Sequence, residues 1–263
     1  MKSKDISIDD IYVKYQSKEL PLSKENNPES FHQEINGTIE AFQEDDEMSP
    51  IGYFKIYVFN LDRTDNQPDY FETFDSVSEE TYEYYHDLFE DPYHLKDKIL
   101  DNFYSNFTQD CQDNEDMLLK EDFENNYRLI IFSSMQIIEK YRGNNIGLAV
   151  IKKMWGILKN ERSILTLKPC PLHDFPKKEE IYEKLQELAN KMHYDKFVTD
   201  EKKGKRKLLK YWSKLGLERI GKNGICFTSN PNFSEIKNKI KLDIIVSEKE
   251  EQPQSTEINQ IRK

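Results

Sequence analysis

A glycine-containing turn between a strand-like run and a helix-like run is the feature that most constrains this chain. Residues 128–138 are mostly apolar and often β-branched, which predicts a central strand of a sheet. After the turn at 141–147, apolar residues recur on one helical face; they are Ile146, Val150, Ile151, Met154 and Leu158. A strand, a glycine turn and an amphipathic helix in this order are typical of α/β folds.

The turn itself predicts an anion site. Gly143 and Gly147 have no β-carbon, so a ligand can approach the backbone N–H groups at the start of the helix, where a pyrophosphate is favoured. Arg142 adds a charge-assisted contact. The glycine spacing is not that of a Rossmann turn, and no Gly-Lys-Ser/Thr follows as in a P-loop. An ordinary strand-to-helix turn is the alternative interpretation.

The rest of the chain has the pattern of a mixed protein. Alternating or apolar runs predict strands at 6–15, 31–42, 51–61, 163–168, 217–220 and 225–228, the second and third forming a hairpin. Helices are predicted from Ser78, at about 93–107, at 177–192, and after the basic segment 202–207 as far as Gly216. Residues 62–75 are polar and include Pro68, and the acid-rich segment 109–126 predicts an exposed connection, with a short helix as an alternative.

Composition and charge exclude several classes of protein. The net charge of −11 excludes a generic polycation, and it is unevenly spread: residues 1–126 hold 10 basic and 32 acidic groups (net −22), and 127–263 hold 28 and 17 (net +11). The three cysteines form no Cys-x-x-Cys pair, so we expect neither a disulfide framework nor a structural zinc.

No signal peptide or membrane helix is expected either. The amino end has no apolar signal core, and no apolar run approaches the roughly 18 residues that a membrane helix needs. We therefore expect a cytoplasmic protein. His86 and His94 have acids nearby, but their spacing matches no metal pattern, so no metal site is predicted.

A resemblance to a known family enters at the turn. Residues 141–147, Tyr-Arg-Gly-Asn-Asn-Ile-Gly, resemble the acetyl-CoA loop of the GCN5-related N-acetyltransferases (GNAT), whose pattern is Arg/Gln-x-x-Gly-x-Gly/Ala. Residues 210–220, Lys-Tyr-Trp-Ser-Lys-Leu-Gly-Leu-Glu-Arg-Ile, are similar to that family's late helix and the strand after it. The two matches come in the family's order with a predicted strand between them, and together they cover roughly residues 127–229.

The resemblance implies a fold and a division of the chain. We expect one α/β domain over residues 1–246, with a mixed, mostly antiparallel central sheet, a splay between strands four and five, and helices on both faces. Residues 1–126 would form the acceptor side and 127–229 the acetyl-CoA-binding core, with an insertion at 169–204. Residues 247–263 are polar and predict a disordered tail.

The resemblance also assigns roles to individual residues. The cofactor-binding residues would be Met135 and Ile137 on the splayed strand and Arg142, Gly143, Asn144, Asn145, Ile146 and Gly147 in the pyrophosphate loop. Tyr211 and Ser134 are the catalytic candidates. Tyr211 would protonate the leaving thiolate, and Ser134, with Ser133 and Gln136, would orient a water that removes the amine proton.

Three residues depart from the family pattern. Asn145 stands where the second loop glycine is usual, and it tolerates a positive φ better than most residues. Trp212 and Lys205 stand where a tyrosine and an asparagine are common. Tyr211 is adjacent to Trp212 but about 100° away around a helix, so it replaces the usual acid only if the helix register shifts. Both aromatics are also explained as core residues.

The resulting hypothesis is an acetyl-CoA-dependent N-acetyltransferase that transfers an acetyl group to a primary amine in a ternary complex. The acidic first half favours a cationic acceptor, steered by charge. A catalytically silent member of the fold that binds CoA or a partner is the first alternative. A nucleic-acid-associated protein using the basic segment 202–207 is a second, less favoured one.

Overall fold

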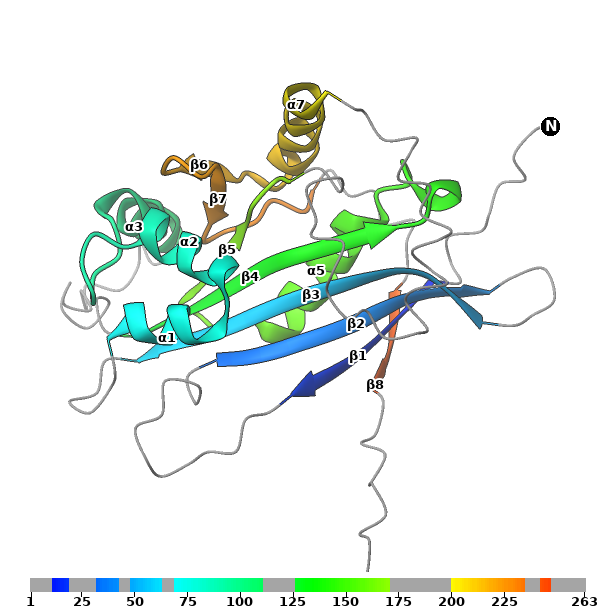
Figure 1. The fold of residues 1–263 in the computed structure, drawn as a ribbon, viewed down its shortest axis with the longest axis horizontal. Helices are drawn as coiled ribbons and strands as arrows, with labels where there is room; N and C mark the ends of the chain where they lie inside the picture. The colour runs from blue at the N-terminus through cyan, green and yellow to red at the C-terminus, as the bar shows by residue number, and fades with distance from the viewer. Residues whose placement is uncertain are drawn as a thin grey trace, which may run out of the picture.

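In the described part of the chain, eight strands form a single sheet (Figure 1). The computed structural model describes residues 11–18, 32–42, 48–62, 69–110, 126–170, 200–234 and 242–246. The strand order is β6-β7-β5-β4-β3-β2-β1-β8. Only the β4–β5 and β1–β8 pairs are parallel within the described residues. The expected α/β class with a mixed, mostly antiparallel sheet is confirmed.

The strands lie close to their predicted positions. Their bounds are β1 Ile11–Lys18, β2 His32–Phe42, β3 Met48–Asp62, β4 Asn126–Ile137, β5 Ser163–Leu167, β6 Glu218–Ile220, β7 Ile225–Thr228 and β8 Leu242–Val246. The predicted hairpin is the antiparallel β2–β3 pair. β8 was not predicted from the sequence; it adds a parallel strand beside β1.

Five α-helices accompany the sheet in the described part of the chain. They are α1 Tyr70–Val77, α2 Glu79–Leu88, α3 Asp97–Asp110, α5 Ile146–Leu158 and α7 Glu201–Trp212. The turn after α7 ends at Gly216 in the left-handed conformation, as predicted (φ 72°). No helix was predicted in the polar segment 62–75, but α1 begins there at Tyr70, capped by the Asp69 carboxylate.

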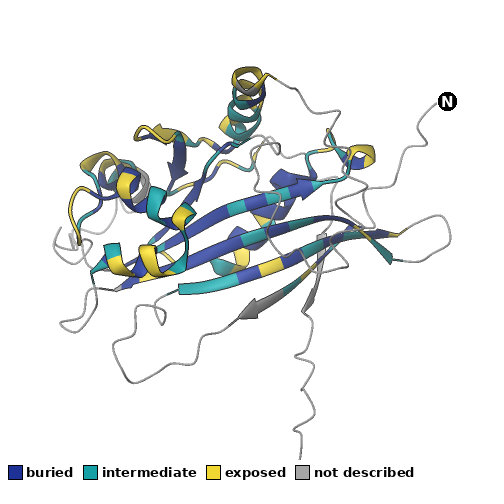
Figure 2. Cartoon of the chain, in the orientation of Figure 1, coloured by how far each residue is buried: buried dark blue, intermediate teal, exposed yellow. Residues whose placement is uncertain are grey.

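The helices cover both faces of the sheet, as expected (Figure 1). On one face, α5 packs on alternate sheet residues such as Ile56, Ile130 and Leu165. On the other face, α1, α2 and α3 pack on residues such as Phe59 and Ile131. Figure 2 shows the central strands buried along most of their length, because helices take them out of water on both sides.

Helix α2 is fixed at both ends by side-chain hydrogen bonds. At its start, the Ser78 hydroxyl accepts from the Thr81 N–H at 3.2 Å and the Thr81 hydroxyl accepts from the Ser78 N–H at 3.1 Å, a reciprocal capping box. Near its end, the buried Asp87 carboxylate accepts from the N–H groups of Lys222 and Asn223, at 3.2 and 2.9 Å. These bonds tie α2 to the β6–β7 turn.

Some predictions fall outside the described residues. They are the helix at 177–192, most of the insertion at 169–204 and the tail at 247–263. Among the described residues, no helix is long and apolar enough to cross a bilayer.

Candidate functional site

The pairing of the two central parallel strands ends before β4 does. Pairs run from Arg128↔Ser163 to Phe132↔Leu167, where β5 ends, while β4 continues to Ile137. Within the described residues, the last four residues of β4, 134–137, therefore pair only with β3. This leaves a gap between β4 and the chain that follows β5, in the place where the splay was expected.

A bulge in β4 sets which side chains face this gap. Lys55 pairs with Ser134 and Ile56 pairs with Phe132, so Ser133 is an extra residue without a partner on β3. A one-residue shift exchanges the two faces of a strand. Beyond the bulge, Met135 therefore lies on the α5 face, where it packs against the core beneath that helix. Both serines lie on the α1–α3 face.

A cavity of about 360 Å³ occupies this end of the sheet. Its walls come from β4, the loop before α5, α5 itself, the chain after β5, and α7. Most of the predicted site residues line it, namely Ser134, Met135, Ile137, Arg142, Gly143, Asn145, Ile146, Gly147 and Tyr211. Asn144 is not in the wall; it is exposed, and its side-chain amide donates to the Tyr141 carbonyl at 3.2 Å. The volume falls in the range of small-molecule pockets.

The loop before α5 has the backbone that its sequence predicts. Gly143 has a φ of 86° and Asn145 a φ of 60°, both in the left-handed region. Asparagine tolerates this region better than most residues, so it fills a glycine position here at small cost. Asn145 is the N-cap of α5 but makes no side-chain capping hydrogen bond. The first N–H groups of a helix have no acceptor within the helix, so they suit an anionic ligand.

Gly147 lies where the helix, β4 and α7 come closest together. A β-carbon at this position would be 3.0 Å from the Met135 sulfur and 3.3 Å from the Tyr211 hydroxyl oxygen. Both distances are tight for a carbon contact, so glycine is the residue that fits without displacing a neighbour. Glycine at this position therefore lets α5, β4 and α7 approach one another closely.

Tyr211 reaches the start of α5 from helix α7. Its hydroxyl accepts a hydrogen bond from the Leu148 N–H at 3.3 Å, and its ring meets Trp212 edge-on with centroids 4.6 Å apart. Burial raises the pKa of Tyr211 to about 12, and the bond from Leu148 opposes this in part. The phenol is therefore protonated at neutral pH. Trp212 also lines the cavity, so both aromatics face the site as well as the core.

The charged side chains of the site come from three segments: the loop before α5, the chain after β5, and α7. The Arg142 side-chain Nε donates to the Ile137 carbonyl at 2.6 Å, which fastens the loop to the end of β4. Lys168 and Lys207 line the cavity, whereas Lys205 does not. Of the basic segment 202–207, the structure thus brings Lys207 and Gly204 to the site.

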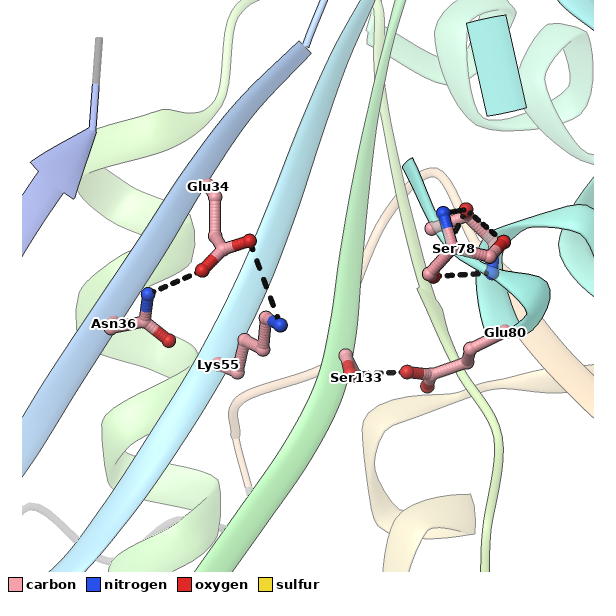
Figure 3. Close-up of polar contacts among 7 residues, drawn as sticks. Glu34, Asn36, Lys55, Ser78, Glu80 and Ser133 are labelled. Carbon is pink, nitrogen blue, oxygen red and sulfur yellow. Dashed lines mark hydrogen bonds and ion pairs between the residues drawn. The ribbon is translucent and has the colours of Figure 1, made fainter. Parts of the chain in front are cut away.

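One polar contact at the site was not predicted. The Ser133 hydroxyl donates to Glu80 Oε2 at 2.7 Å, joining the β4 bulge to the first turn of α2 (Figure 3). Beside it, Glu83 of α2 forms an ion pair with Lys168. The two members of the Ser133 contact are 53 positions apart, and no sequence pattern links them.

Possible metal ligands do not gather in the described part of the chain. His94 pairs with Asp91 on the surface at 2.8 Å, and no group of three or more His, Cys, Asp or Glu could hold a metal ion among the described residues.

Comparisons of the chain with protein-family models, with curated proteins and with solved structures find no match.

Proposed function

We propose that this protein is an acetyl-CoA-dependent N-acetyltransferase of the GNAT type, acting on a primary amine. The observation that carries the proposal is the cavity at the end of β4, whose wall holds nine of the predicted site residues, from the strand, the loop and the late helix. Chance placement of two distant motifs in one wall is a weaker explanation.

The residues of the loop fit a pyrophosphate. Gly143 and Asn145 turn the backbone, Gly147 adds no side chain at the helix start, and the helix dipole favours negative charge there. Acetyl-CoA would supply the activated acetyl group as a thioester. Its amide-containing arm would pair with the edge of β4 that β5 leaves uncovered, at Met135 and Ile137.

The gap in the sheet suits a reaction between two substrates. The loop, Met135 and Tyr211 approach the cavity from the α5 side, and Ser133 and Ser134 approach it from the α1–α3 side. A donor bound on the first side and an acceptor on the second would meet between β4 and β5. Direct attack in a ternary complex then requires only that both are held in line.

Tyr211 is suited to protonate the sulfur that leaves. Its hydroxyl oxygen is held by the Leu148 N–H, and in the described part of the chain its own proton is donated to no acceptor. A pKa of about 12 keeps that proton on the phenol at neutral pH. The departure at Trp212 is thereby compensated by its neighbour, whose side chain reaches the start of α5.

Binding of acetyl-CoA is the first test. A ligand that binds only the folded state raises its stability in proportion to RT ln(1 + [L]/Kd), so millimolar acetyl-CoA should raise the melting temperature by several degrees, and adenine should not. Release of free thiol with a panel of primary amines then separates an enzyme from a silent CoA-binding protein. No stabilisation by acetyl-CoA would contradict both.

A further inference from the structure

The contact between Ser133 and Glu80 connects the cavity to a carboxylate outside it. Ser133 lines the cavity, and its hydroxyl donates to Glu80 Oε2 at 2.7 Å (Figure 3). Glu80 is not part of the wall and is half-buried. Glu80 is therefore connected to the cavity through one hydrogen bond, the one from Ser133.

The bulge explains why this serine reaches the helix. Ser133 is the extra residue of β4, unpaired on β3, and its neighbour Ser134 turns to the same face of the sheet. A bulge bends a strand and redirects a side chain in this way. Helix α2 presents Glu80 in its first turn, behind the Ser78 cap, and this position favours a carboxylate.

Several charged and titratable groups surround Glu80. Glu83 of α2 pairs with Lys168 after β5, and Lys55 of β3 pairs with Glu34 of β2 at 3.5 Å. The phenols of Tyr57 on β3 and Tyr84 on α2 lie nearby; burial raises both of their pKa values, and the negative charge of Glu80 raises them further.

We infer that Glu80 is the proton acceptor for the acetyl acceptor, with Ser133 as the bridging hydroxyl, and that the site takes primary alkylammonium substrates. This inference rests on the proposed acetyltransferase function. An ammonium at the gap donates one proton to the Ser133 oxygen, and Ser133 passes its own proton to the Glu80 carboxylate. The negative charge of Glu80 favours binding of the cationic amine. The carboxylate then accepts a proton from it, before the neutral amine attacks the thioester.

The proton balance of the transfer is complete with these groups. The neutral amine nitrogen forms a bond to the thioester carbonyl carbon, and the carbon–sulfur bond breaks. The second nitrogen proton leaves for solvent, while Tyr211 gives its proton to the departing thiolate and is then reprotonated by solvent. The products are the N-acetyl amide, CoA thiol and one proton, which Glu80 returns to water.

The test compares Glu80→Gln with Glu79→Gln, using thiol release from acetyl-CoA with n-butylamine, 1,4-diaminobutane and Nα-acetyl-lysine. Both residues lie in the first turn of α2, so both changes remove the same helix-end charge. At pH 7 we expect Glu80→Gln to lower kcat/KM about 100-fold and Glu79→Gln to leave it unchanged. By pH 9.5 the loss should shrink at least 5-fold, because an alkylamine of pKa about 10.4 then supplies its own neutral form.

Ser133→Ala provides a second variant if Glu80→Gln folds poorly, and it should show the same pH-dependent loss. Equal rates for Glu80→Gln and the wild type would overturn the inference, as would a loss of the same size at both pH values, which indicates a structural role. A wild-type protein that is stabilised by acetyl-CoA but uses none of the three amines would also overturn it. Absence of stabilisation would instead contradict the proposed function itself.

Discussion

The two faces of the sheet present opposite polar groups to the same gap. On the α5 face, the site is made of backbone N–H groups, a phenol and an arginine, all suited to negative charge. On the α1–α3 face, it is made of two serines with the carboxylates of Glu80 and Glu83 behind them. Under the proposed function, this difference would place an anionic donor and a cationic acceptor on opposite sides of the gap.

The uneven charge along the chain agrees with this comparison. The acidic half provides α2 with its carboxylates, and the basic half provides the loop, α5 and α7. Long-range steering by such charges weakens when salt shortens the screening length to about 8 Å at physiological ionic strength. Four substitutions test the two faces separately.

The largest effect is expected from Gly147→Glu on the α5 face. The new side chain would collide with Met135 and Tyr211 and place a negative charge at the anion site. Stabilisation by acetyl-CoA should disappear completely in a thermal shift assay. Gly156→Glu is the matched control on the same helix, because nothing lies within 4 Å of its β-carbon position, and it should keep the full shift.

The next largest effect is expected from Asp87→Ala on the other face. Asp87 is 4% exposed, and the change leaves the N–H groups of the β6–β7 turn without their acceptor. We expect a loss of about 3 kcal/mol in the free energy of unfolding, measured with denaturant. Asp75→Ala, on the exposed side of α1, should change it by less than about 0.5 kcal/mol. Equal losses would show that the turn does not depend on Asp87.

Tyr211→Phe should separate binding from catalysis on the α5 face. Without the phenolic proton, kcat should fall about 100-fold in the thiol-release assay, while acetyl-CoA still stabilises the protein. Tyr93→Phe, on an exposed ring, is the control and should retain full activity. An unchanged kcat in Tyr211→Phe would favour a purely structural phenol.

Tyr211→Phe should also change how the free energy of unfolding depends on pH. Folding raises the pKa of Tyr211 from 10.0 to about 12, so the unfolded chain loses this proton first as the pH rises. The contribution of Tyr211 to the free energy of unfolding is therefore fully present below pH 10 and is lost between pH 10 and 12. Relative to Tyr211→Phe, the wild type should lose up to about 2–3 kcal/mol of unfolding free energy over that window.

The smallest effect is expected from Ser78→Ala at the start of α2. It removes the acceptor for the Thr81 N–H and half of the capping box. We expect a loss of about 1 kcal/mol in the free energy of unfolding, measured by denaturant titration. Ser76→Ala, whose hydroxyl bonds only locally within α1, is the control with a smaller expected loss. A larger loss at Ser76 would contradict the role of the cap.

Much of the fold followed from local patterns in the sequence. The run at 128–138, the turn and the amphipathic helix became β4, the loop and α5, because branched apolar residues, glycines and helical spacing act within a few positions. Helix α1 was not predicted because it has few apolar residues and the sequence around it is polar. Strand β8 escaped because its five residues gain a partner only from β1, over 200 positions away.

The candidate site divides in the same way. The loop residues could be predicted because glycine and asparagine at fixed spacing have a backbone meaning of their own. The reach of Tyr211 to Leu148 could not, because it depends on how α7 is packed against α5. The Ser133–Glu80 bond depends on a bulge, and a bulge is fixed by the pairing of two strands rather than by one of them.

The sequence by itself determined most of the elements, the glycine-containing turn before α5 and the uneven charge, since these depend on neighbouring residues and on composition. Only the tertiary structure decided that the turn, Tyr211 and two serines share one cavity, and that Glu80 lies behind it. The physical reason is that strand register and helix packing join residues far apart in the chain, and a one-residue bulge reverses which side chains face the gap.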